Sequence, residues 1–192
     1  AGMDAEVCAN KERFQQWPLV QGKSAYLLSL LYCFFSKIRY RFQVSIDGAP
    51  PLEGDFLFAV AANGRYCGGG FQSAPGASVR DGKLDCLLVK AVSRAKIISL
   101  LGHYTKGTHV QLKDICTFVR ASRLEVASQV PAAVNEDGEV RRAEKVCFEV
   151  LPSALRFIVP GPCTEREKEA KAKTEKSKQV AAVGIAPEMA GT

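Results

Sequence analysis

The chain has 192 residues, of which 47% are hydrophobic and 24% are charged, a composition typical of a globular protein and unlike that of a disordered or fibrous one. This length supports one domain with a substantial core and is too short for two ordinary domains. The net charge of +6 is compatible with anionic membrane surfaces, nucleotides or nucleic acid, and it selects none of them.

The seven cysteines are odd in number and lack the regular spacing of a disulfide framework. Most of them lie in apolar runs, where buried reduced thiols are the simplest interpretation. We therefore expect a reducing, cytoplasmic environment. No two cysteines have the spacing of a zinc knuckle, and His103 and His109 are interpreted as surface or packing residues. No apolar run is long enough to cross a bilayer.

In chain order, residues 22–38 are the first segment with a clear period. Their apolar residues recur at helical spacing and predict a helix. These residues are Tyr26, Leu27, Leu30, Leu31, Phe34 and Phe35. An amphipathic helix that meets lipid is one interpretation, and a helix packed on the domain's own sheet is the favoured one. Residues 40–46 then alternate apolar and polar, which predicts a half-exposed strand. Asp47-Gly48 followed by Pro50-Pro51 predicts a connection longer than a tight hairpin.

Residues 56–62 are almost wholly apolar without a helical period and predict a buried strand. Asn63-Gly64 favours positive φ and predicts a tight turn. The run of three glycines at positions 68–70 indicates sharp bends and close packing. It has neither the Rossmann nor the Walker spacing of a phosphate-binding loop. Residues 81–85, Asp-Gly-Lys-Leu-Asp, then lead into a second apolar strand over 86–89.

The second half of the chain predicts one more helix and several short strands. Ser93 is a candidate cap for a helix through Leu101, with Ile97, Ile98, Leu100 and Leu101 turned inward. Strands are expected at 115–120, 123–127, 146–150 and 155–159. Together these elements predict a mainly β fold with α insertions, an antiparallel β-sandwich over residues 1–160. Residues 161–192 are expected to form a disordered charged tail, and binding of its lysines to an anionic surface is the alternative.

Two acidic segments could carry chemistry. Asp137-Gly138-Glu139 lies in a polar stretch between two apolar strands, and its spacing alone predicts a hairpin turn. Asp81 with nearby main-chain carbonyls could supply the oxygen ligands that Mg²⁺ prefers. An Asp-Gly turn without an ion is the alternative for that segment.

In the order and spacing of its motifs, this chain resembles one known family. Asn63-Gly64, Gly68-Gly69-Gly70, Ala74-Pro75, Ala77 and Asp81-Gly82-x-Leu84-Asp85 resemble the C-terminal domain of soluble lipid kinases. This is the diacylglycerol kinase and sphingosine kinase-like family, especially its bacterial members. Residues 1–5, Ala-Gly-Met-Asp-Ala, and Asp137-Gly138-Glu139 agree with it. The resemblance covers residues 1–160 and implies the same β-sandwich fold.

The resemblance implies ATP and Mg²⁺ as cofactors and assigns roles to several residues. Glu139 would accept the proton of a lipid hydroxyl with Asp137 beside it, and Gly138 and Glu139 would lie near the nucleotide phosphates. The structural magnesium site would use the carbonyl of Ser78, the side chain of Asp81 and the carbonyl of Lys83, with Asp85 orienting that set. Asn63, Gly68, Gly69 and Gly70 would line the lipid entrance.

The N-terminal part of such a kinase carries a Gly-Gly-Asp-Gly motif, which this sequence lacks. We therefore expect a fragment or one partner of a split enzyme, inactive alone, that works with an ATP-binding domain in cis or in trans. The expected reaction is transfer of the ATP γ-phosphate to diacylglycerol, giving phosphatidic acid, at the cytoplasmic surface of a membrane. Homodimerisation is left open and no nucleic-acid partner is expected. A non-catalytic lipid- or partner-binding module and a kinase for a soluble substrate are the alternatives.

Overall fold

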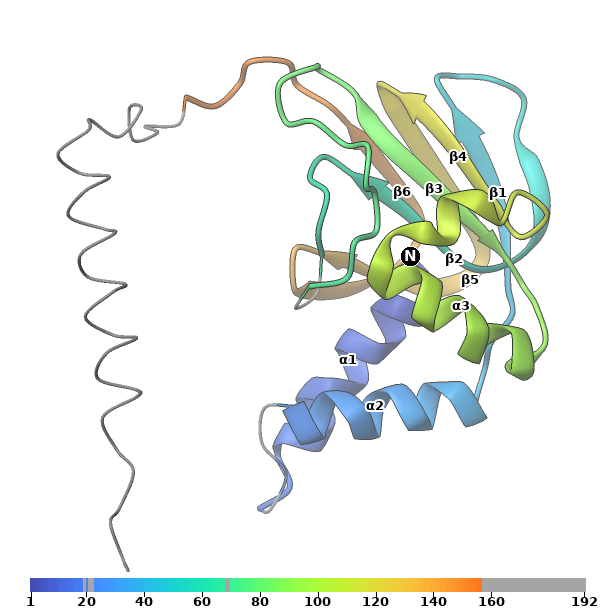
Figure 1. The fold of residues 1–192 in the computed structure, drawn as a ribbon, viewed down its shortest axis with the longest axis vertical. Coiled ribbons are helices and arrows are strands. Elements are labelled where there is room, and N and C mark those ends of the chain that lie inside the picture. Colours follow the sequence, from blue (N-terminus) through green and yellow to red (C-terminus); the bar gives the residue numbers. More distant parts are fainter. Residues whose placement is uncertain (19, 21–22, 68–69, 157–192) are drawn as a thin grey trace, which may run out of the picture. The chain divides into compact units, whose positions relative to one another are not determined.

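The computed structural model describes residues 1–18, 20, 23–67 and 70–156 (Figure 1). Residues 1–154 form one compact unit. The predicted tail, Gly68, Gly69 and most of the predicted strand 155–159 lie outside the described residues. Within the described part of the chain, no helix is long and apolar enough to span a membrane. Its helices are α1 (Met3–Gln15), α2 (Lys23–Phe35), α3 (Arg94–Lys106) and the 3₁₀ helix η1 (Thr108–Gln111).

The strands form one antiparallel sheet in the order β4-β3-β2-β1-β5-β6. They are β1 (Tyr40–Ile46), β2 (Leu52–Ala62), β3 (Leu84–Lys90), β4 (Cys116–Ala121), β5 (Arg123–Glu136) and β6 (Glu139–Glu149). In β1 the alternating residues Tyr40, Phe42 and Val44 are buried, as their period predicted. The expected fold class, mainly antiparallel β with inserted helices, is confirmed.

The chain enters the sheet at Gly2, directly before α1. Gly2 bridges Phe58 of β2 and donates its N–H to the Ala133 carbonyl of β5 at 3.4 Å. Its φ is +104°, and a Cβ at this position would lie 2.7 Å from the Leu57 carbonyl oxygen. Only glycine accepts this backbone conformation and this contact without strain. The close approach holds the first turn of α1 against the sheet.

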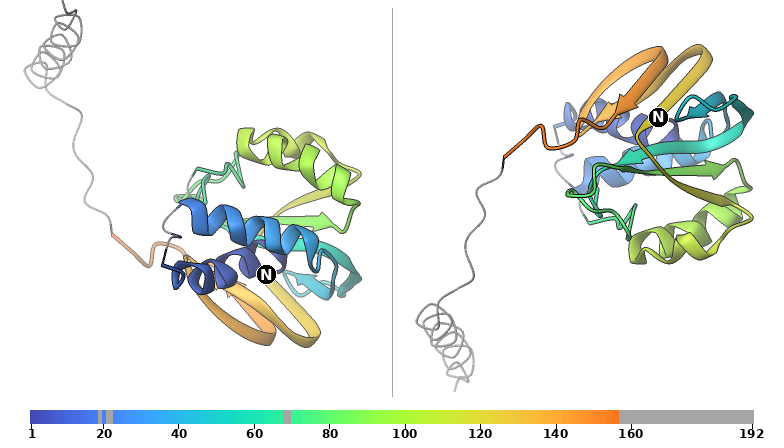
Figure 2. Two further views of the ribbon diagram at one scale, coloured as in Figure 1. Left: turned by 90° about the horizontal axis from the view of Figure 1, so that it is seen from below. Right: turned by 90° about the horizontal axis from the view of Figure 1, so that it is seen from above.

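Helix α2 is confirmed by the structure, but its packing differs from the favoured interpretation. It packs chiefly on α1, and α1 contacts β5, β2 and β6. Sequence analysis assigned no helix to residues 3–15, because their apolar residues show little helical periodicity. Because α2 packs chiefly on α1, it buries only part of its apolar face, and Leu27, Leu31 and Phe35 remain exposed. Figures 1 and 2 show α1 and α2 side by side, with α3 separate from both.

Helix α3 is longer than predicted and faces the core less completely. It continues through Gly102 and ends at Lys106, and the C-cap residue Gly107 has a φ of +71° in the left-handed region. Ile97 and Leu100 are buried as expected, whereas Ile98 is 65% exposed. The prediction that Ile98 and Leu101 turn inward is wrong, because only one side of α3 packs on the core. His109 is fully buried and its Nε2 lies 3.0 Å from the Ser73 carbonyl, so it is a packing histidine.

The connections around β2 correct one turn prediction and confirm another. Neither Asn63 nor Gly64 has positive φ, so the predicted tight turn does not form there. The described residues between β2 and β3, 63–67 and 70–83, instead belong to a long connection, and such a connection does not need to reverse within two residues. The β1–β2 connection spans residues 47–51, longer than a tight hairpin as predicted, with positive φ at Asp47 and Gly48.

Candidate functional site

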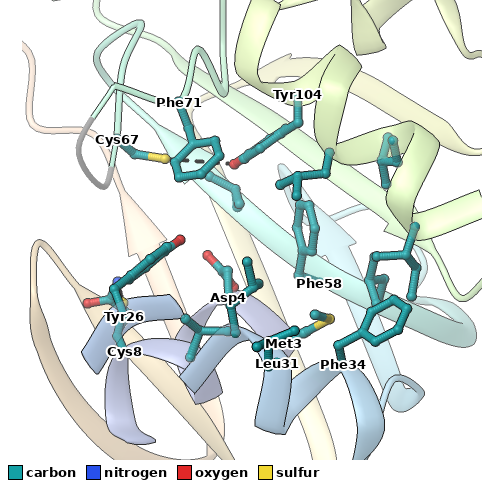
Figure 3. Close-up of a pocket in the computed structure, with 18 of the residues that line it drawn as sticks. Met3, Asp4, Cys8, Tyr26, Leu31, Phe34, Phe58, Cys67, Phe71 and Tyr104 are labelled. Atoms are coloured by element: carbon teal, nitrogen blue, oxygen red, sulfur yellow. Dashed lines mark hydrogen bonds between the residues drawn. The ribbon is translucent and has the colours of Figure 1, made fainter. Parts of the chain in front are cut away.

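An apolar pocket of about 450 Å³ lies between the pair α1 and α2, the strand β2 and the helix α3 (Figure 3). This volume is within the range of ligand-binding sites, roughly 300–1,000 Å³. Its lining includes Met3, Leu30, Phe34, Leu57, Phe58, Ile97 and Leu100. The pocket is therefore suited to a hydrocarbon chain or another apolar group.

The polar groups of the pocket are gathered toward one side (Figure 3). Asp4 and Cys8 of α1, Tyr26 of α2, Cys67 of the β2–β3 loop and Tyr104 of α3 all line it. The Tyr104 hydroxyl lies 3.7 Å from the Cys67 sulfur. Phe34 and Phe58 occupy the opposite side in the figure. An amphipathic ligand would thus bind in one orientation, with its polar end toward Asp4.

Asp4 places a carboxylate in these apolar surroundings. It lies in the first turn of α1, and its Oδ1 accepts a hydrogen bond from the Ala5 N–H at 2.8 Å. Burial raises the pKa of the Asp4 carboxyl above its ordinary value. Burial likewise raises the pKa of the Cys8 thiol and raises the pKa of the Tyr26 hydroxyl to about 12. None of the described residues that line the pocket is a lysine, arginine or histidine.

Asn135 connects the pocket to the predicted catalytic turn. Its side-chain amide donates to the Cys8 sulfur at 3.4 Å, and its Oδ1 accepts a hydrogen bond from the Gly138 N–H at 2.9 Å. Positive φ at Asp137 (52°) and Gly138 (111°) closes a two-residue hairpin turn between β5 and β6. The turn predicted from spacing is confirmed. The side chain that shapes it also lines the pocket.

Asp137, Gly138 and Glu139 are exposed at the tip of this hairpin. Glu136 and Glu139 form the last residue pair between β5 and β6, so Asp137 and Gly138 project beyond the end of the paired strands. Arg141 donates two hydrogen bonds to Glu136 beside the turn. The structure therefore leaves the three residues that the resemblance marked exposed on the surface of the domain.

The predicted metal segment forms a separate acidic corner. Asp81 accepts a hydrogen bond from the Lys83 N–H at 3.0 Å. Arg120 lies 3.8 Å from both the Asp81 and the Asp85 carboxylates, and Asp85 Oδ2 is buried without a hydrogen-bond partner. The oxygen donors of this segment fit the chemistry of Mg²⁺, and the Arg120 guanidinium faces both carboxylates as a counter-charge. In the described part of the chain, no three His, Cys, Asp or Glu side chains cluster to hold a metal, so main-chain carbonyls would have to complete the set.

The remaining predicted residues lie around the same loop. Ser78 accepts a hydrogen bond from the Arg80 N–H through its side chain, and the Lys83 ammonium donates to Ser122. Asn63 and Gly70 are not among the residues that line the pocket. Cys67 and Phe71, which flank the glycine run, do line it.

Sequence reasoning missed four polar residues of the pocket, namely Asp4, Cys8, Tyr104 and Asn135. Asp4 and Cys8 lie one helical turn apart on α1, whereas Tyr104 belongs to α3 and Asn135 to β5, so no local spacing links all four. The available signal was Asp4 itself, which lies in the motif Ala-Gly-Met-Asp-Ala that agrees with the family.

Comparison with known proteins agrees with this architecture. Residues 1–159 match the family described as "YegS C-terminal NAD kinase beta sandwich-like domain". A protein of Stenotrophomonas maltophilia named "Probable lipid kinase YegS-like" is 36% identical over 112 residues, which are 58% of this chain and 36% of that protein. The "Diacylglycerol kinase" of Mycobacterium tuberculosis is 30% identical over 161 residues, which are 83% of this chain and 50% of that protein.

A solved diacylglycerol kinase structure from Bacillus anthracis superimposes with a TM-score of 0.53 at 23% identity, over 68% of this chain and 44% of that one. That likeness shows the shared fold. The chain spans half or less of the length of these relatives. Because the family match extends over the whole of the compact unit, this chain belongs to the C-terminal domain family of the YegS-like lipid kinases and diacylglycerol kinases.

Proposed function

We propose that this domain binds the lipid substrate and carries the catalytic base of an ATP-dependent lipid kinase, with diacylglycerol as the substrate. The observation that supports this most is the link through Asn135. An apolar pocket with one polar side is joined by a single side chain to an exposed turn that carries Asp137 and Glu139. A lipid oriented by that polarity directs its hydroxyl toward the turn.

The chemistry assigned to the turn is proton transfer. The lipid hydroxyl oxygen forms a bond to the γ-phosphorus of ATP while the bond from that phosphorus to the bridging oxygen breaks, and ADP leaves. Glu139 accepts the hydroxyl proton, and Asp137 lies beside it. Gly138 and Glu139 lie near the phosphates of ATP in this proposal. Because Gly138 has no side chain, the phosphates can approach the turn closely. An ATP-binding domain, in cis or in trans, supplies the nucleotide.

Mg²⁺ would fit the acidic corner at the end of the β2–β3 loop, beside β4. Asp81 would hold it with the carbonyl oxygens of Ser78 and Lys83, while Asp85 would orient that set from behind. When bound, the ion supplies positive charge that fixes the loop before β3. Asn63 and the glycines at positions 68–70 belong, in this proposal, to the lipid entrance near Cys67.

The substrate would reach the pocket from a membrane surface. Leu27 and Leu31 of α2 and Ile98 of α3 line the pocket and are also exposed. Exposed apolar side chains at the entrance of an apolar pocket suit contact with the edge of a bilayer. The proposal therefore includes peripheral attachment to the cytoplasmic face of a membrane.

The test is Glu139→Gln in the full kinase, or in this domain supplied with its ATP-binding partner. Loss of the base should lower kcat by about 10²–10⁴-fold and leave diacylglycerol binding unchanged. Glu144→Gln, an exposed glutamate on β6, is the matched control and should keep full activity. An unchanged kcat in Glu139→Gln would remove Glu139 from this role. Lipid binding without any turnover, with an ATP-binding domain present, would favour the non-catalytic module.

A further inference from the structure

Arg94, the first residue of α3, ties the end of α2 to α3. Its Nε donates to the Phe34 carbonyl at 2.9 Å, and its Nη2 donates to the carbonyls of Phe35 and Ser36 at 3.2 and 3.1 Å. The last carbonyls of a helix have no partner within that helix. The final turn of α2, residues 32–35, has no basic side chain of its own to meet them. Arg94 therefore caps α2 from a neighbouring helix, and its positive charge suits the negative end of the helix dipole.

The hydrogen bonds of Arg94 lie beyond the apolar end of the pocket. Tyr26 near the start of α2 and Tyr104 near the end of α3 belong to the polar side, and Phe34 lies opposite them (Figure 3). The Phe34 side chain lines the pocket, while its carbonyl accepts from Arg94. Ile97, one turn after Arg94 on α3, lines the pocket as well. Arg94 itself is not among the described lining residues, so it joins the two helices just outside the apolar lining.

We propose that Arg94 is a positioning residue that ends the apolar part of the pocket and so sets the length of the acyl chain that the domain accepts. This inference rests on the proposed function, because it takes the pocket to be the lipid site. A hydrocarbon chain that extends past Phe34 meets the exposed Arg94 guanidinium. Such a chain takes water away from a charged group and gives no hydrogen bond in return, which is unfavourable. The three hydrogen bonds of Arg94 also keep α2 and α3 from separating to make room.

The length of α2 along the pocket gives the expected limit. Tyr26 and Phe34 lie about 12 Å apart along the helix axis, at a rise of about 1.5 Å per residue. An extended chain of about ten carbons spans this distance, since each C–C bond is about 1.5 Å long and the chain zigzags. Longer chains should therefore gain nothing from their additional methylenes inside the pocket.

The experiment measures how affinity depends on chain length, with this chain alone and without ATP. Straight-chain primary alcohols from 1-hexanol to 1-dodecanol are titrated one at a time by calorimetry at neutral pH, below their solubility limits. Each added methylene should lower the dissociation constant about fourfold while the chain still enters the pocket. In wild type this gain should stop at a cutoff near 1-decanol. A gain that continues undiminished to 1-dodecanol would overturn the proposed boundary.

Arg94→Ala should move the cutoff to a longer alcohol and leave the affinities of the shortest alcohols unchanged. Arg94→Gln is the milder variant, because its amide is shorter and lacks the guanidinium fork, and it should move the cutoff in the same direction. Arg39→Ala is the matched control, since it removes another exposed arginine close to the end of α2. Its cutoff should equal that of wild type. Circular dichroism of each variant shows whether it is folded, and Arg94→Gln decides the test if Arg94→Ala is not.

The cutoff separates a boundary from general support of the fold. A variant that weakens every alcohol by the same factor, with the cutoff of wild type, would show that Arg94 only stabilises the helices, and it would overturn this inference. The kinase proposal would still stand in that case. Failure of wild type to bind any of the alcohols would overturn both the inference and the lipid pocket of the proposed function.

Discussion

Asn135 accepts a hydrogen bond from the Gly138 N–H at 2.9 Å, and through its amide group it also contacts the Cys8 sulfur in the pocket. One side chain thus connects the lipid-sized cavity with the turn that carries Asp137 and Glu139. In the proposed function, this contact would hold the turn that carries Glu139 beside the polar side of the pocket. Mutation of Asn135 can therefore test whether the pocket and the turn act together.

Asn135→Ala in the full kinase should lower kcat by about tenfold, because the turn loses the acceptor that fixes Gly138. The lost hydrogen bond should also cost about 1 kcal/mol of stability. Asn135→Asp retains an acceptor for the Gly138 N–H and should recover most of kcat. Steady-state kinetics and chemical denaturation of both variants check this. Equal loss of kcat in the two variants would contradict a role through the Gly138 contact.

The raised pKa of Asp4 predicts how stability depends on pH. An acid with a raised pKa in the folded state binds more protons when folded, so stability falls as the pH rises above the unfolded carboxyl pKa. Asp4→Asn should therefore raise Tm relative to wild type near pH 7. The difference should vanish below about pH 4, where the carboxyl is protonated in both states. Thermal melts across this range measure it, and a difference that grows toward low pH would show the opposite linkage.

Asp81 should be required for any stabilisation by Mg²⁺. If the ion binds the folded loop, Mg²⁺ at 100 times its dissociation constant adds about 2.7 kcal/mol of stability to wild type. Asp81→Ala should melt at the same temperature with and without Mg²⁺. Asp114→Ala, which removes an exposed carboxylate elsewhere, should respond like wild type. A full Mg²⁺ response in Asp81→Ala would place the ion at another site.

Gly2→Ala should destabilise the domain by about 2–4 kcal/mol. The new Cβ would lie 2.7 Å from the Leu57 carbonyl oxygen, at a φ of +104° that alanine rarely adopts. Gly64→Ala is the control, because its Cβ meets no atom within 4 Å and its φ is not positive. Urea denaturation compares the two variants. Similar stability of the two variants would mean that the backbone around residues 1–2 shifts away from β2 at little cost in free energy, and it would contradict this prediction.

Leu31→Gln should weaken binding to diacylglycerol-containing vesicles by up to about tenfold. Leu31 lines the pocket yet is 46% exposed, so its apolar surface is available to lipid and its loss should cost little folding stability. Val130→Gln alters a comparably exposed side chain outside the pocket lining. Vesicle sedimentation should show no effect for Val130→Gln. Equal weakening by both variants would argue for a non-specific apolar surface.

Local patterns in the sequence determined much of the fold. Alternation in residues 40–46 predicted β1, helical spacing predicted α2, and Asp137-Gly138 predicted the turn between β5 and β6. These features depend on neighbours in the chain, so periodicity and turn chemistry reveal them. The order of the glycine and aspartate motifs also indicated the family, which the match over residues 1–159 confirmed.

Only the tertiary structure decided where the pocket lies and which polar groups face it. Asp4, Tyr26, Cys67, Tyr104 and Asn135 come from five separate segments, and packing of α1 on the sheet brings them together. Helix α1 itself escaped prediction, because its place depends on Gly2 fitting against β2 more than on a periodic apolar face. The same packing leaves part of α2 exposed at the pocket. Long-range contacts, which have no local period, therefore determine the site.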